Sequence, residues 1–233
     1  MTFEIEVIHS DPYLLVVNKP AGLLSIPDGY DPALPHIRSL LEPEYGRLFT
    51  LHRLDKETSG LLVLARDAET HRAMNTLFDT REIEKRYQCL VLGRPDWVDR
   101  NETTPLRVNA DRDHRTLAGK PDVKPAKTVF HVLKLFDKAS LIGAELFSGI
   151  THQIRAHIAN LGHPILLDTL YTRAIYKADM LPYEAILAAA GHSKRLMLHA
   201  LNLKFSHPIT QEQMSFTAPL PPDFSYLLKV LNK

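Results

Sequence analysis

The chain has 233 residues, of which 45% are hydrophobic and 24% are charged, so it can bury the core of an ordinary globular protein. Its formal net charge of +1 excludes a chain that is basic throughout, and any nucleic-acid site must be a local patch. The single cysteine, Cys89, excludes an internal disulfide and a thiolate metal cluster, and its apolar neighbours predict a core residue. The chain lacks a signal-peptide pattern and a membrane-length apolar run, so we expect a cytoplasmic protein.

The first half of the chain predicts short strands and two helices. Apolar alternation and β-branched runs predict strands over 3–9, 13–17, 61–65 and 87–92. A short helix is expected near 36–41. Asp67 can cap a second helix over 68–79, whose Ala73, Met74, Leu77 and Phe78 lie on one side.

The second half begins with a polar, proline-bearing segment, 94–127, which we expect to form mostly loops. Further elements are predicted as follows: a hairpin from 128–136 and 140–147, a helix over 152–161 capped by Thr151 and ended by Gly162, a helix over 177–190, a strand over 215–217 and a C-terminal helix. Short strands mixed irregularly with few helices predict an α+β fold, with a mixed, mainly antiparallel β-sheet core and flanking helices and loops. We expect residues 1–233 to form a single catalytic domain, without a separate N-terminal RNA-binding domain.

The segment over 51–60, LHRLDKETSG, gathers the carboxylates of Asp55 and Glu57, two cations, a hydroxyl pair and a turn glycine. It stands between a loop and a buried strand, a junction at which sites are often built. By itself the segment is better interpreted as a charged turn in which Asp55 pairs with Arg53 or Lys56, since such turns are common.

Two later segments strengthen the case for a site. Tyr87 stands at the entry of a strand, after Lys85 and Arg86. Arg155 lies beside the predicted apolar stripe of the helix over 152–161, from which it can reach a partly buried carboxylate. Alternatively, Tyr87 packs its ring in the strand and exposes its hydroxyl to solvent. The alternative for Arg155 is an exposed cation on the helix surface.

In this order, the three segments resemble the RluA family of pseudouridine synthases. The first resembles the family's H-R-L-D-x-x-T-S-G motif without a mismatch, the second its K-x-Y entry, and the third its G-R-T-H-Q-I-R-x-H motif. The resemblance extends over about residues 5–218. Two positions depart from it: Ile150 replaces an arginine, which removes a polar contact, and Leu167 replaces a glycine before Asp168, which predicts a reshaped turn.

The resemblance implies a pseudouridine synthase fold and the isomerisation of a uridine in rRNA or tRNA, without a cofactor or metal. Asp55 would be the nucleophile, attacking C1′ or the base, and both routes remain open. Arg155 would keep Asp55 charged, and Tyr87 would stack on the nucleotide and handle a proton. The target base would flip out of its stack, and Arg53 could fill the vacated space or hold a phosphate. The expected substrate contacts are Arg53, His52, Thr58, Leu198, Lys19 and Arg86.

RNA is the expected partner; we expect no membrane association, and a monomer is favoured. Phosphate contacts are also predicted from Arg81, Lys85 and the basic residues of 107–127: Arg107, Arg112, Arg115, Lys120, Lys124 and Lys127. Two rival functions remain, a non-catalytic RNA-binding protein and a nucleosidase or glycosidase that pairs Asp55 with Glu57. The histidines show no H-E-x-x-H spacing that would predict a zinc site.

Overall fold

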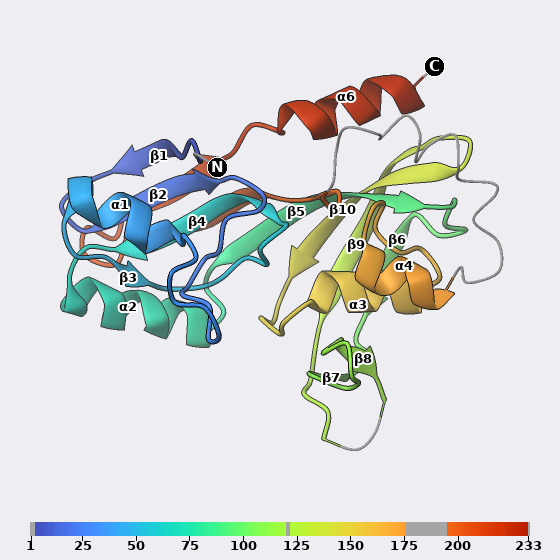
Figure 1. The fold of residues 1–233 in the computed structure, drawn as a ribbon, viewed down its shortest axis with the longest axis horizontal. Helices are drawn as coiled ribbons and strands as arrows, with labels where there is room; N and C mark the ends of the chain where they lie inside the picture. The colour runs from blue at the N-terminus through green and yellow to red at the C-terminus, as the bar shows by residue number, and fades with distance from the viewer. Residues whose placement is uncertain (1–2, 120–121, 176–194, 233) are drawn as a thin grey trace. The chain divides into compact units, whose positions relative to one another are not determined.

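The computed structural model describes residues 3–119, 122–175 and 195–232. The chain divides into two compact units, each drawn in Figure 1: the first comprises Met1–Lys85 and Ala200–Pro219, and the second Arg86–His199 and Leu220–Lys233. The helix predicted over 177–190 lies outside the described residues.

Most strand pairs of the first unit are antiparallel. Its neighbouring strands are, in order, β1 (Glu6–Ser10), β2 (Leu14–Lys19), β4 (Ser59–Ala65) and β11 (Leu198–Ser206); β12 (Gln213–Thr217) pairs with β11, and β3 (Phe49–Thr50) with β4. The register of β2 on β4 runs from Leu14 opposite Ala65 to Lys19 opposite Gly60. This register brings the end of β2 beside the start of β4, where the Asp55 segment enters the sheet.

Two helices accompany this sheet, α1 (Ile37–Tyr45) and α2 (Ala68–Asp79). The predicted bounds of α2 are confirmed at both ends. At its start the Asp67 carboxylate accepts hydrogen bonds from the backbone N–H groups of Glu69 and Thr70. Figure 1 shows α2 beside β3 and β4. Met74 is the buried centre of its apolar side. It joins a core cluster with Leu14, Val16, Leu61, Val63, Ile83, Leu203, Phe205, Phe216 and Ala218.

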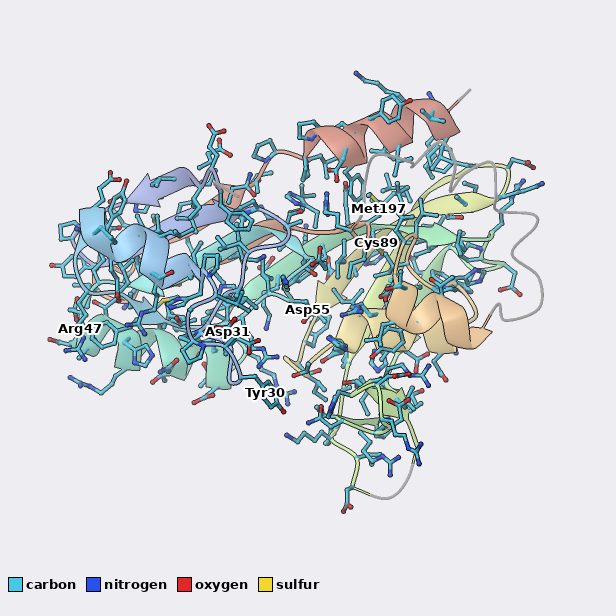
Figure 2. All side chains as sticks on the ribbon, viewed as in Figure 1. Tyr30, Asp31, Arg47, Asp55, Cys89 and Met197 are labelled. Atoms are coloured by element: carbon cyan, nitrogen blue, oxygen red, sulfur yellow. The ribbon has the colours of Figure 1, made fainter. Side chains whose placement is uncertain are left out.

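The second unit holds another antiparallel set, in the order β5 (Glu84–Leu92), β10 (Ala139–Leu146), β9 (Thr128–Leu135) and β6 (Asp99–Glu102). β9 and β10 form the predicted hairpin. The segment over 94–127 contains β6 and a small two-stranded sheet of β7 (Leu106–Arg107) and β8 (Leu117–Ala118). Cys89 and Met197, labelled in Figure 2, are both fully buried. Burial raises the pKa of the Cys89 thiol to about 12, as expected for an inert core residue.

The helices of this unit are α3 (Gln153–Asn160), α4 (Thr169–Ile175) and α6 (Pro222–Leu231). The Thr151 cap prediction is wrong: the N-cap is His152, which has a left-handed φ of 58° and no side-chain capping bond. Gly162 does end α3, at φ 86°. The N–H groups of Gly162 and His163 donate to the carbonyls of Ala159 and Ile158, the two bonds of a Schellman motif.

A mixed sheet with mostly antiparallel strands and few helices confirms the predicted fold class. The sequence reading assigned no strand to 198–206, which forms β11, and no helix to 169–175, which forms α4.

Candidate active site

Asp55, labelled in Figure 2, lies on the segment between β3 and β4 of the first unit. Its carbonyl accepts a hydrogen bond from the N–H of Thr58 at 3.0 Å, which closes a turn over Lys56 and Glu57. Asp55 is partly buried, whereas Arg53 is exposed. The turn leads directly into β4, which is buried along its whole length. The carboxylate therefore stands on a rigid support.

The buried ammonium of Lys19 binds the backbone of this turn. Lys19 is 0% exposed, and its Nζ donates to the carbonyls of Pro20, Leu23 and Lys56 at 3.0, 2.7 and 3.1 Å. The Lys56 carbonyl also accepts the Gly22 N–H at 2.8 Å. A phosphate contact is therefore the wrong role for Lys19, because its charge lies inside the fold and binds the backbone next to Asp55.

Ser25 fixes the residue before Asp55, and the sequence reading missed it. Its buried hydroxyl donates to the Leu54 carbonyl at 2.8 Å and accepts the Leu54 N–H at 3.0 Å. One side chain thus satisfies both backbone groups of Leu54, which is itself buried. No motif signals this role, since the bonds span 29 positions of sequence.

His52, predicted to contact substrate, binds the backbone of β4 through its ring nitrogen. Its Nε2 accepts the backbone N–H of Val63 at 3.1 Å, and its ring packs on Phe78 with centroids 5.2 Å apart. Burial, helped by the Lys85 cation, lowers the pKa of His52 to about 3. The ring is therefore neutral at physiological pH, with its proton on Nδ1.

Gly60 allows β4 and β11 to approach closely. Its φ is +115°, and a Cβ there would lie 2.2 Å from the carbonyl oxygen of Ala200 and 2.6 Å from its nitrogen. Only glycine fits this backbone approach. Thr58, predicted to contact substrate, is buried, and its hydroxyl has no hydrogen-bond partner among the described residues.

In the second unit, Arg155 is buried and paired with a carboxylate. Its Nε and Nη2 donate to the two carboxylate oxygens of Asp168 at 2.7 and 2.9 Å. The guanidinium also lies over the Tyr171 ring, 5.1 Å from its centroid. At 7% exposure Arg155 is not the exposed helical cation of the alternative reading. Bidentate pairing fixes the plane of its guanidinium.

A network of side-chain hydrogen bonds connects α3 to the neighbouring Thr104 and Thr128. Gln153 donates to the hydroxyl of Thr128 at 2.9 Å, and this hydroxyl lies 2.9 Å from His157 Nδ1. His157 Nε2 lies 2.9 Å from the Thr104 carbonyl, which can only accept, so the proton is on Nε2. Burial lowers the pKa of His157. Every residue of α3 from Gln153 to Ala159 is buried, which holds Arg155 in place.

Both departures from the family motifs are visible in this unit. The Ile150 N–H donates to Gln153 Oε1 at 3.1 Å, while its side chain packs against a cluster that includes Ala156 and Tyr171. Ile150 thus makes an apolar contact at the position where the family motif has an arginine. Leu167 has a φ of +64°, in the left-handed backbone region that glycine favours.

The remaining predicted residues also lie in the second unit. Tyr87 is buried on β5, opposite Ala144 of β10. Leu198 is buried at the start of β11. Arg86 is exposed and pairs with Glu145, its cross-strand neighbour, at 3.0 Å.

The predicted site residues are thus divided between the units. The first unit contains Asp55, Arg53, His52, Thr58 and Lys19. The second unit contains Tyr87, Arg86, Arg155 and Leu198. Over residues 3–119, 122–175 and 195–232, no group of three or more His, Cys, Asp or Glu side chains could hold a metal ion. Over the same ranges, every helix is too short or too polar to cross a membrane.

Comparison with known proteins gives consistent matches. Residues 13–160 match the family described as RNA pseudouridylate synthase. The ribosomal large subunit pseudouridine synthase D of Zymomonas mobilis is 34% identical over 238 residues, covering 97% of this chain and 73% of that protein. The dual-specificity RNA pseudouridine synthase RluA of Pasteurella multocida is 35% identical over 216 residues, 92% of this chain and 93% of that one. The solved structure of human RNA pseudouridylate synthase domain containing 4 has a TM-score of 0.78 at 25% identity, covering 97% of this chain and 93% of that one.

Proposed function

Because the chain belongs to the RNA pseudouridylate synthase family, we propose that it isomerises specific uridines of structured rRNA or tRNA, with Asp55 as the nucleophile. The observation that carries the role of Asp55 is the support of its turn. Lys19 and Ser25 bind the backbone of the residues on either side of it, and Gly60 anchors the strand that follows. A nucleophile that must meet one atom of a flipped nucleotide requires such a fixed position.

The reaction exchanges one glycosidic bond for another. The N1–C1′ bond of uridine breaks and a C5–C1′ bond forms; C5 releases its proton and N1 gains one. Asp55 would open this sequence by attacking C1′ or the base ring, and the supporting contacts are compatible with both routes. No electron acceptor or phosphate donor enters the balance.

Arg155 is assigned the role of stabilising the charged form of Asp55 during the reaction. Asp168 and the Tyr171 ring hold its guanidinium in one orientation inside the second unit. Electrostatic stabilisation is most effective when the stabilising charge needs no reorganisation, and a buried, bidentately held guanidinium satisfies this condition.

Tyr87 and Leu198 complete the proposed pocket. Tyr87 would stack on the flipped nucleotide and move a proton through its hydroxyl, and Leu198 would exclude water that could otherwise release the base. The exposed Arg53, two residues before Asp55, would fill the space that the flipped base leaves or hold a phosphate. Normal turnover by an Arg53→Ala variant would contradict this role.

The test uses rRNA and tRNA labelled with tritium at C5 of uridine and lacking pseudouridine. The wild type should release tritium to water without free uracil, and Asp55→Asn should release none. Glu57→Gln, which changes the neighbouring carboxylate of the same turn, is the matched control and should keep the wild-type rate.

Each rival function predicts a different outcome. Free uracil would indicate a nucleosidase, and loss of activity in Glu57→Gln would support its two-carboxylate mechanism. RNA binding without tritium release, unaffected by Asp55→Asn, would indicate a pure binding protein. Mapping pseudouridines in total RNA from cells that contain the wild type or Asp55→Asn would then identify the modified position.

A further inference from the structure

Two cationic residues, Arg81 and Lys85, lie four positions apart between the end of α2 and the start of β5. α2 closes with a Schellman motif, in which the Arg81 N–H donates to the Phe78 carbonyl at 3.3 Å and the Glu82 N–H to the Leu77 carbonyl at 2.9 Å. Arg81 has the left-handed φ of 63° that this position requires. Glycine adopts that backbone without strain, so an arginine is held there at a cost in folding free energy.

Lys85 lies four residues further on and is partly buried. Its Nζ lies 5.7 Å from the centroid of the Phe78 ring. Burial and the Arg81 cation both lower the pKa of its ammonium, and among the described residues no carboxylate opposes them. The Lys85 ammonium, beside the Phe78 ring, is thus partly dehydrated and interacts with the Arg81 cation, and both features favour the approach of an anion.

The acidic residues of this turn are engaged elsewhere. Glu82 accepts a hydrogen bond from the Thr80 hydroxyl at 2.6 Å. Glu84 pairs with Lys204 at 3.1 Å. Neither therefore serves as the counter-ion of Lys85.

This pair of cations is close to the support of the Asp55 turn. The same Phe78 ring packs on His52, and the Lys85 charge contributes to the low pKa of His52. His52 is three residues before Asp55. All of these residues lie in the first unit.

We propose that Arg81 and Lys85 form an anion subsite that binds a backbone phosphate of the RNA substrate beside the Asp55 turn. This inference rests on the proposed function. An RNA phosphodiester fits better than a free phosphate, because sites for free phosphate use backbone N–H groups, and those of Arg81 and Glu82 are already bonded to helix carbonyls.

The test measures the binding of purified tRNA and of large-subunit rRNA as a function of salt concentration. Arg81→Gly and Lys85→Met should each weaken binding several-fold near 0.1 M salt and lower the slope of log K against log salt by about 0.7–0.9. Lys204→Met, which removes a paired lysine from the neighbouring strand β11, is the matched control and should keep the wild-type slope.

Stability separates this role from a structural one. Arg81→Gly should raise the midpoint of thermal unfolding while it lowers RNA affinity, a combination that loss of structure cannot produce. Unchanged affinity and slope in both Arg81→Gly and Lys85→Met would overturn the inference. So would a thermal shift by inorganic phosphate that Lys85→Met abolishes while RNA binding stays intact, since that result indicates a free-anion site. Failure of the wild type to release tritium would instead refute the proposed function, and the binding slopes would still decide on the subsite.

Discussion

The neutral state of His52 predicts a loss of stability in mild acid. In the folded protein its pKa is about 3, against the ordinary histidine value of 6.5 in the unfolded chain. Below pH 6.5 the unfolded chain takes up a proton at this residue while the folded protein does not, so unfolding is favoured. Above pH 6.5 both states are neutral and His52 contributes no pH dependence. The loss therefore grows as the pH falls from about 6.5 toward 3.

The size of the effect follows from the two pKa values. At pH 5 the unfolded state is almost fully protonated at this residue and the folded state is almost fully neutral, which lowers the free energy of unfolding by about 2 kcal/mol. A folded pKa higher by about one unit would leave this figure nearly unchanged, because protonation of the unfolded chain dominates at pH 5.

The assay is urea unfolding of the wild type and His52→Gln at pH 7.5, 6.5, 5.5 and 5.0. The glutamine oxygen can still accept the Val63 N–H, but the side chain does not titrate. His157 and the other titrating groups are common to both proteins, so the difference between the two curves isolates His52. The variant should be the less stable protein at pH 7.5, because it loses ring packing on Phe78, and the gap should narrow by about 2 kcal/mol at pH 5. Parallel curves would refute the low pKa of His52 in the folded protein.

Three further substitutions test the supports of the site. Gly60→Ala should lower the free energy of unfolding by about 2–4 kcal/mol in urea titration, because its Cβ meets the Ala200 backbone; a smaller change would mean that the strands can separate. Asp168→Asn leaves the buried Arg155 without its carboxylate and should cost about 3–5 kcal/mol by calorimetry, with slower tritium release where the protein still folds; wild-type values in both would contradict the orienting role. Leu167→Gly should be more stable than Leu167→Ala by about 1 kcal/mol, reversing the usual order, because φ is left-handed there; the ordinary order would disprove the strain.

Local signals in the sequence sufficed for elements whose ends carry their own chemistry. The Asp67 cap located the start of α2, and Gly162 located the end of α3, because each of these residues satisfies helix-end groups by itself. The hairpin of β9 and β10 followed from its alternation. β11 gave no such signal, because its burial changes along its length and its position depends on the partner strands.

Within the candidate site, residue types were easier to predict than residue roles. Asp55 and Arg155 were selected by their motifs, and the structure gives each a rigid support. Lys19 and His52 were assigned to the substrate, because sequence alone does not show that the Lys19 ammonium and the His52 ring bond the backbone. Ser25 escaped notice for a related reason: its partner, Leu54, is distant in sequence. Long-range hydrogen bonds leave no periodicity and no local motif.

Arg81 and Leu167 both adopt the left-handed backbone that favours glycine. α2 and α3 end in the same pair of hydrogen bonds, yet α3 uses Gly162 at that position and α2 uses Arg81. Leu167 likewise occupies a glycine-type backbone immediately before Asp168, whose carboxylate orients Arg155. Strain of this kind persists only where the surrounding contacts determine the backbone, and it is concentrated near functional sites. The two cases differ in what a glycine would change: at 81 it would remove a charge from the proposed RNA surface, whereas at 167 it would relieve strain and leave the carboxylate in place. Relief of strain should therefore impair RNA binding at the first position only.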